Sequence, residues 1–361
     1  MPGNKFATTV FSKLDMNKAA TVIDPSELES LFSVAEVAPK AETSEKKVVD
    51  QKHSCLDPKK IQNVAIFLKT IKLPLKEIPD TILTTCGVST DFLNEEMTTK
   101  LIENSATDEE MAAIKAWLAE PGNSEEKLND VDRFFLSLSN IPQCKQRLET
   151  WIYAIQFQDR YEAVKQSLLK IKSAVSCMKE NGKLFLELIE LILALGNFIN
   201  SGGRNGAAPG FFLLRTLDKL KDIRGSDANK TTLLTYLVQL TQKKKPAVCG
   251  WLTPFEPLKY AKTTDLVDTQ TDLQGLRGDF KRENAKIASI QKSNSKWDVY
   301  DVAMPAKYSD FSEKLDALEL MSADVDSAFL QLLNDYGEDK KTKTKEFFTA
   351  ITDFMDSWQK T

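Results

Sequence analysis

Residues 195–220 read LGNFINSGGRNGAAPGFFLLRTLDKL, and four of the chain's 14 glycines lie between positions 202 and 210. A Walker phosphate loop requires Gly-Lys followed by Ser or Thr, but the Gly182-Lys183 pair is followed by Leu184. A dinucleotide-binding loop requires G-x-G-x-x-G after a strand, and neither that spacing nor a strand precedes the second helix here. The run is instead typical of a helix end, at which Asn200 or Gly202 takes the left-handed conformation before the chain turns.

The stretch before this corner, KLFLELIELILALGNFIN at 183–200, carries apolar residues around most of a helical circumference. A helix that is apolar on all sides is typically buried, so we expect a core helix. Glu187 and Glu190 could be interpreted as an acid/base pair, but two Glu residues three positions apart more often form the narrow polar stripe of a core helix.

The rest of the chain also predicts helices, and no stretch alternates as a strand. Residues 144–178 contain neither Pro nor Gly and predict a helix of about 35 residues, ~50 Å long. Apolar residues at heptad-like spacing from Tyr308 to Tyr336, interrupted only by Ser322, predict a helical seam that begins near Pro305. Residues 262–298 form its more polar hairpin partner, and 345–360 a final helix. Helix starts are expected at 57–58, 89–91, 107–110 and 227.

Composition excludes several classes of function. The chain has 361 residues, 48 Lys plus Arg against 52 Asp plus Glu, and a net charge of −4, so a basic nucleic-acid footprint is absent. No apolar run reaches the ~18–20 residues of a membrane helix, and no signal peptide is recognisable. Five separated cysteines predict reduced thiols in the cytosol.

A catalytic apparatus that needs histidine would have to use His53, the only histidine, which is better interpreted as a solvated loop residue. A metal site with several histidines is impossible. We therefore expect no enzyme, no cofactor, no metal site and no nucleic-acid or membrane partner, and a cytoplasmic location.

The segment 195–240 resembles the signature of the formin homology 2 domain. That signature is Gly-Asn-aromatic-x-Asn, a Ser-Arg-Asn-Gly-like corner, Gly-Phe, a Leu-x-Lys-Leu-x-Asp helix, and Lys followed by Thr-Leu-Leu. The matching residues are Gly196, Asn197, Phe198, Asn200, Arg204, Asn205, Gly206, Gly210, Phe211, Lys219, Leu220, Asp222, Lys230, Thr232, Leu233 and Leu234. Residues 23–32, 56–78 and 332–358 also resemble segments of the family, so the resemblance covers about residues 9–358.

The resemblance implies an all-α, elongated, rod-like helical domain. It places a truncated lasso and following helix at 1–32, a flexible linker at 33–54, and a knob at 55–135. The coiled-coil region would be 136–180 with 262–336, and the post 181–261 with 337–361. It also implies a domain that binds actin, nucleates filaments and associates with or caps the barbed end, located at the cytoskeleton. The alternatives are a helical scaffold or adaptor without actin activity and, more remotely, a phosphotransfer or nucleotide-hydrolysing enzyme.

Site residues follow from the same resemblance. Ile66 matches the knob isoleucine that packs on actin, although its spacing alone favours a core residue, and Lys230 matches a lysine at the post-side actin contact. Lasso and post of two subunits would meet in a head-to-tail homodimer at Phe11, Gly196, Asn197, Phe198, Asn200, Arg204, Asn205 and Gly206.

The lasso is where the sequence departs from the family. Phe11 occupies the place of the second of two anchoring tryptophans, and the first has no counterpart, so we expect a weak dimer with a detectable monomer. The 13 prolines contain no Pro-Pro run, so no profilin site is expected in this chain.

Overall fold

The computed structural model describes residues 52–200, 208, 210–226 and 231–361. The chain divides into two units, 1–51 and 52–361, and only the second is described, by itself. It is all-α: the described residues contain no β-strand, only two isolated bridges. Its elements, with 3-10 helices as η, are α4 (Pro58–Thr70), η2 (Leu75–Glu77), α5 (Ile78–Thr85), α6 (Glu95–Glu103), α7 (Asp108–Ala119), η3 (Glu125–Lys127), α8 (Asp130–Leu138), α9 (Cys144–Glu180), α10 (Lys183–Asn200), α11 (Leu213–Lys219), α12 (Leu233–Lys244), η4 (Pro246–Phe255), α13 (Leu258–Ala261), α14 (Leu266–Ser289), α15 (Tyr300–Asp335) and α16 (Thr344–Lys360).

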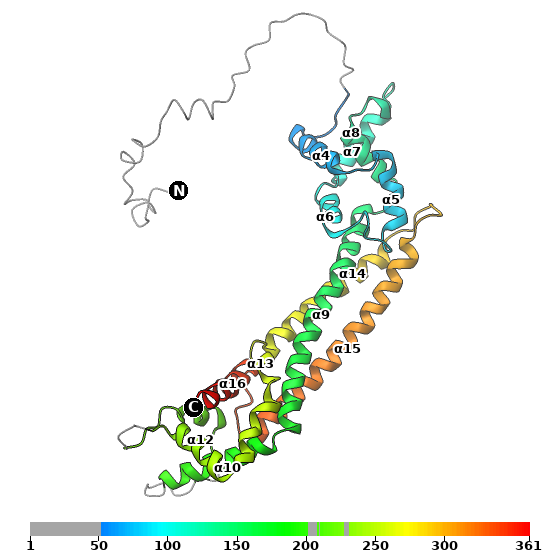
Figure 1. The fold of residues 1–361 in the computed structure, drawn as a ribbon. Helices are drawn as coiled ribbons and strands as arrows, with labels where there is room; N and C mark the ends of the chain where they lie inside the picture. The colour runs from blue at the N-terminus through cyan, green and yellow to red at the C-terminus, as the bar shows by residue number, and fades with distance from the viewer. Residues whose placement is uncertain (1–51, 201–207, 209, 227–230) are drawn as a thin grey trace, which may run out of the picture. The chain divides into compact units, whose positions relative to one another are not determined.

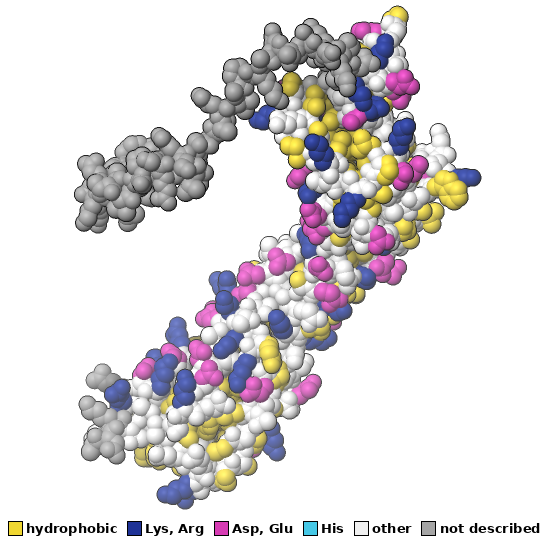
Figure 2. Space-filling view, turned by 45° about the horizontal axis from the view of Figure 1, so that its top comes forward, with side chains coloured by type: hydrophobic (Ala, Val, Ile, Leu, Met, Phe, Trp, Pro, Cys, Tyr) yellow, Lys and Arg dark blue, Asp and Glu magenta, His cyan; other side chains and the backbone are white. Residues whose placement is uncertain are grey.

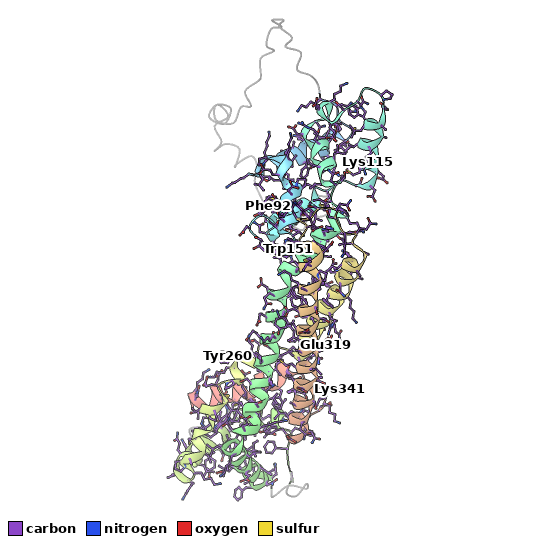
Figure 3. All side chains as sticks on the ribbon, turned by 90° about the vertical axis from the view of Figure 1, so that its right-hand side faces the viewer. Phe92, Lys115, Trp151, Tyr260, Glu319 and Lys341 are labelled. Carbon is purple, nitrogen blue, oxygen red and sulfur yellow. The ribbon has the colours of Figure 1, made fainter. Side chains whose placement is uncertain are left out.

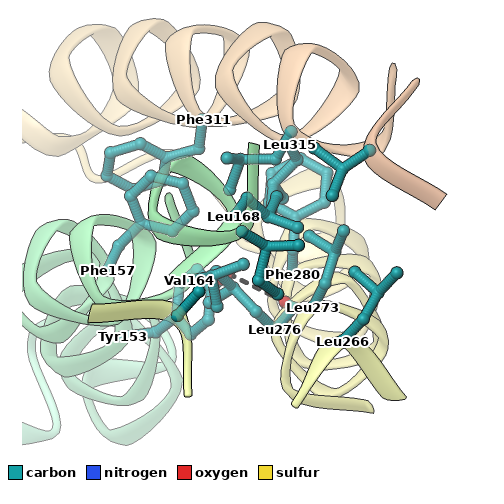
Figure 4. Packing of buried hydrophobic residues seen from close by; sticks show 14 of the residues in the cluster. Tyr153, Phe157, Val164, Leu168, Leu266, Leu273, Leu276, Phe280, Phe311 and Leu315 are labelled. Carbon is teal, nitrogen blue, oxygen red and sulfur yellow. Dashed lines mark hydrogen bonds between the residues drawn. The ribbon is translucent and has the colours of Figure 1, made fainter. Parts of the chain in front are cut away.

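Three long helices form the middle of the unit, where α9 packs against both α14 and α15 (Figure 1). Aromatic rings fill the space between them: the rings of Phe157 and Phe311 stack with centroids 3.9 Å apart (Figure 4). Tyr308 stacks on Phe280. The predicted seam of α15 is confirmed, since its apolar positions from Tyr308 to Leu332 are buried and Ser322 is buried among them. The long Pro- and Gly-free helix is confirmed as α9.

Helices α4–α8 form a cluster at one end of α9 (Figure 1). Trp151 joins α9 to this cluster, because its indole N–H donates to the carbonyl of Leu93 at 2.9 Å (Figure 3). Two predicted helix starts are confirmed: Asp57 caps α4, and Thr107 with Glu110 forms a reciprocal capping box on α7.

The predicted helix start at 89–91 is wrong. The Ser89 hydroxyl accepts from the amide of Asp91, and helix α6 begins later, at Glu95, with Asn94 as its cap. The error has a physical cause, since the Ser and Asp side chains that cap helices also close turns. The expected start at Asp227 lies outside the described residues, and the nearest described helix, α12, is capped by Thr232.

Helices α10–α13, η4 and α16 form the cluster at the other end of α9. Trp251 is fully buried at its centre, and four aromatic rings pack on its indole with centroids 5.2–5.9 Å away: Phe185, Phe255, Phe354 and Trp358. The predicted apolar face of the final helix is therefore confirmed, with its Phe, Ile, Met and Trp residues in this core.

Two further expectations are corrected. Helix α15 begins at Tyr300, so Pro305 lies inside it; the exposed proline lacks only one helical hydrogen bond, while Tyr300, Met304 and Tyr308 on the other face are buried. Helix α10 is not buried on all sides. Its neighbours cover only the face of Phe185, Leu188 and Ile192, and Leu186 is 51% exposed.

Candidate functional site

Ile66 lies on the outer face of α4. Asp57 fixes the start of this helix, its carboxylate accepting from the amides of Lys59 and Lys60 at 2.9 and 3.3 Å. Val64, Phe67 and Leu68 are buried, whereas the side chain of Ile66 is 58% exposed. The interpretation of Ile66 as a core residue is therefore wrong. The helix holds an aliphatic side chain outward, in water, on a rigid support.

A partly buried ion pair braces α4 against α7. Lys60 forms a close ion pair with Glu110, donates to the carbonyl of Ser105 at 3.2 Å and lies over the ring of Phe135. Burial raises the pKa of the Glu110 carboxyl, but the bonds from Lys60 and Thr107 outweigh burial and hold this pKa below its usual value. The ion pair therefore persists at neutral pH and holds α4, the helix that carries Ile66, against α7.

Asn197 closes the chain on itself near the end of α10. Its Nδ2 donates to the carbonyl oxygen of Ala208 at 3.0 Å, and its Oδ1 accepts from the Ala208 amide at 2.8 Å. The sequence prediction assigned Asn197 to contact with a partner subunit; the structure engages its amide group within its own chain. These two reciprocal bonds join Asn197 and Ala208, the residues on either side of the glycine-rich corner.

The glycines at this corner have no internal packing role among the described residues. A Cβ atom added at Gly196 or Gly210 would meet nothing within 4 Å. Glycine inside a helix costs roughly 1 kcal/mol relative to alanine, so Gly196 weakens α10 without any gain in packing inside the chain. Among the described residues, therefore, nothing obstructs a Cβ at the half-buried Gly196.

Several apolar side chains of α10, and that of the residue before α11, are exposed. Phe198 is 79% exposed, and Leu186, Ile199 and Phe212 are also exposed. Figure 2 shows hydrophobic side chains gathered on the surface of this end of the unit. The sequence reasoning missed Leu186 because it treated α10 as a core helix. The spacing of the sequence could have shown this, because Leu186 shares one helical face with the charged Glu190 and the polar Asn197. Such a face is typically exposed.

The remaining predicted site residues, Phe11, Arg204, Asn205, Gly206 and Lys230, lie outside the described residues. The described residues before and after the gap that contains Lys230 are paired through their backbones. The amide of Gly225 donates to the carbonyl of Thr231 at 2.9 Å, and the amide of Leu233 donates to that of Ile223 at 2.8 Å.

The described residues show no catalytic constellation. None of their His, Cys, Asp and Glu side chains form a group of three or more that could hold a metal ion, and none of their helices is both long and apolar enough to cross a membrane. Burial raises the pKa of the Cys86 thiol well above its usual range and that of Cys144 to about 12, which makes both poor nucleophiles. His53 stacks on Trp117 with centroids 4.5 Å apart.

Comparison with known families decides the identity of this architecture. The family model described as Formin Homology 2 Domain matches residues 2–359, nearly the whole chain. The chain belongs to the formin homology 2 family. Formins are a family of actin-assembly proteins, without enzymatic activity of their own.

Individual relatives agree with this assignment. The formin homology 2 domain is 26% identical to human Protein diaphanous homolog 3 over 83% of this chain, and 28% identical to Formin-A of Dictyostelium discoideum over 99%. It is 31% identical to Formin-like protein 14 of Arabidopsis thaliana over 80%. The chain spans only 24%, 29% and 23% of the length of these three relatives.

Proposed function

We propose that the chain is an actin-binding domain that nucleates filaments and associates with, or caps, the barbed end. The observation that carries the proposal is the outward position of Ile66 on a braced helix, in a domain of the formin homology 2 family. An exposed aliphatic side chain on a rigid support loses little conformational entropy on docking and gains from desolvation. Lys230 is the second proposed contact, since actin is acidic and a lysine favours docking to it.

We also propose that two copies form a weak head-to-tail homodimer. The exposed apolar surface around Gly196, Phe198 and Asn200 would receive the N-terminal arm that carries Phe11. Support comes from the exposure of Leu186, Ile199 and Phe212, and from Gly196, where an added Cβ would meet no atom of the described residues within 4 Å. Such a surface on a single chain typically marks an interface. A location at the cytoskeleton follows from the proposed activity.

Pyrene-actin assembly tests the actin contact. We expect Ile66→Ala to reduce the affinity for barbed ends by about tenfold or more, the usual effect of truncating an interface hot spot. Lys230→Asp should act in the same direction. Leu320→Ala is the matched control, because Leu320 is also an exposed aliphatic residue, 69% against 58% for Ile66, and lies on another helix, α15. Circular dichroism should show parental helicity in all three variants.

The same experiment separates the proposal from its alternative. If the chain is a scaffold or adaptor, the parent protein should not change the rate of actin assembly at any concentration. If the parent assembles or caps actin and the Ile66 and Lys230 variants do so equally well, these two residues are wrongly assigned although the activity stands.

A further inference from the structure

The loop between α14 and α15 presents the most exposed tryptophan of the chain. All five tryptophans lie in the described residues; Trp151, Trp251 and Trp358 are buried and Trp117 is half-buried, whereas Trp297 is 65% exposed. Exposed single hydrophobic residues are common and need no explanation by themselves. Trp297 differs because of what holds its loop and what surrounds it.

One buried guanidinium fixes both ends of the loop. Arg147 is 1% exposed; its Nη1 donates to the carboxylate of Asp298 at 2.7 Å and its Nη2 to the carbonyl of Gln291 at 2.9 Å. Its Nε donates to the carbonyl of Pro142 at 3.0 Å, which ties the loop to the start of α9. Residues 292–297 are therefore held outward between two fixed points, and the indole is presented on a largely preorganised loop.

The loop continues into a small apolar surface on α5 and α15. The amide of Val299 donates to the carbonyl of Leu83 at 3.1 Å, which joins the loop to α5. The next turn passes through Gly87, whose positive φ and close approach to Ala303 admit no larger residue. Val88 follows it, and Val302 lies in the first turn of α15; both are exposed, Val302 by 78%. We call Val88, Trp297 and Val302, with Lys292 and Lys296, the Trp297 surface.

The charge that this surface shows to solvent is positive. Lys292 and Lys296 are exposed, and the Lys296 ammonium lies 4.9 Å from the centre of the indole ring. Two carboxylates of this region lie against Arg147: Asp298 is paired with its guanidinium, and the partly exposed Asp301 lies 3.8 Å from it. Asp91, three residues after Val88, is an exposed carboxylate on the α5 side. An aromatic anchor beside two lysines fits an acidic protein that also offers an apolar pocket.

We propose that the Trp297 surface is a further actin contact, in addition to those proposed at Ile66 and Lys230, made with a different actin subunit from the one that meets Ile66. The inference rests on the proposed function, because it takes actin as the acidic partner. Figure 1 shows α4 and the loop between α14 and α15 on different sides of the helices α5–α8, so one flat contact does not include both. A domain that brings actin subunits together needs more than one actin-binding surface, and the loop is already ordered for docking.

Barbed-end affinity, measured by inhibition of elongation with pyrene-labelled actin, tests the proposal. We expect Trp297→Ala to weaken binding by about tenfold or more, and Trp297→Phe by less, since the ring is kept. The double variant Lys292→Glu/Lys296→Glu should slow association and flatten its dependence on ionic strength. Leu320→Ala is again the control, and Ile66→Ala is the reference for the proposed function.

The outcomes separate the two proposals. If Trp297→Ala loses affinity for barbed ends and Leu320→Ala keeps it, the result supports the Trp297 surface as an actin contact. Parental affinity in Trp297→Ala beside a weakened Ile66→Ala overturns this inference and leaves the proposed function intact, whereas parental affinity in both overturns both assignments. If Trp297→Ala changes only the sedimentation of the protein and not its actin affinity, the surface joins copies of this chain and the inference is wrong. Circular dichroism and thermal unfolding verify that each variant is folded.

Discussion

Replacing Asn197 tests whether the closure of the glycine-rich corner positions the proposed dimer surface. Asn197→Ala removes both hydrogen bonds to Ala208, the one donated at 3.0 Å and the one accepted at 2.8 Å. Asn197→Asp removes only the donor: the Ala208 amide keeps its acceptor, but a carboxylate oxygen now faces the Ala208 carbonyl. The two variants thus separate loss of both bonds from loss of one with added repulsion.

The expected magnitude follows from the contacts. Each hydrogen bond contributes about 0.5–1.5 kcal/mol net, and the exposure of this pair places both near the lower limit, so Asn197→Ala should cost about 1–2 kcal/mol locally. About 1.4 kcal/mol is tenfold in an equilibrium constant, so exchange of the Ala208 amide should accelerate by about five- to thirtyfold. In Asn197→Asp a negative charge in the last turn of α10 adds about 0.3–1 kcal/mol of unfavourable helix-dipole energy.

Hydrogen exchange at Ala208 and sedimentation of the dimer are the two readouts. We expect faster exchange at Ala208 in Asn197→Ala, smaller acceleration in Asn197→Asp, and a weaker dimer in both. Asn284→Ala, at an exposed residue of α14 outside the proposed dimer surface, is the control for loss of an amide side chain. Unchanged exchange in Asn197→Ala would refute the closure; accelerated exchange with an unchanged dimer constant would refute its role in positioning the surface.

Two further predictions concern stability. Arg147→Met should lower the free energy of unfolding by about 3–5 kcal/mol, because it leaves the Asp298 carboxylate buried without its cationic partner. The double variant Arg147→Met/Asp298→Leu should recover part of this loss in urea unfolding, and an equal loss in both variants would contradict the reasoning. Burial raises the pKa of Asp132, with partial opposition from the Cys55 amide and His53. The folded state therefore binds the carboxyl proton of Asp132 more readily than the unfolded state, in which the pKa of Asp is about 3.9. The parent loses stability as pH rises from this unfolded-state pKa to the higher pKa of the folded state. Asp132→Asn should lack this loss, and identical pH profiles of the two proteins would sink the assignment.

The helices that the sequence predicted well are those whose apolar residues keep a helical period over many turns. In α9, α15 and α16 each buried side chain enforces the same face, so local propensity and packing agree. Ends were predicted less well. Ser89 and Asp91 close a turn with the side chains that would also cap a helix, and Pro305 is tolerated inside α15 because it faces solvent.

Exposure within a helix could not be predicted from composition, because it depends on which neighbours the fold supplies. Ile66 has the spacing of a core residue, yet the cluster α5–α8 covers only the Val64 and Phe67 side of α4. The positions of Phe11, Arg204 and Lys230 lie outside the described residues, so their roles stay predictions.

The case of α10 explains why the same residues predicted a core helix and yield a surface. Its mean composition is apolar, but among the described residues only Phe185, Leu188 and Ile192 are fully buried, and Leu184, Ile189, Leu191 and Leu195 are partly buried against the core. Leu186 and Phe198 lie outside this covered face and are exposed. An interface helix of an oligomer resembles a core helix cut in half, so hydrophobic periodicity cannot distinguish the two. Among the described residues no atom lies within 4 Å of a Cβ added at Gly196. A purely structural helix would gain about 1 kcal/mol from alanine at this position, and this favours an interface.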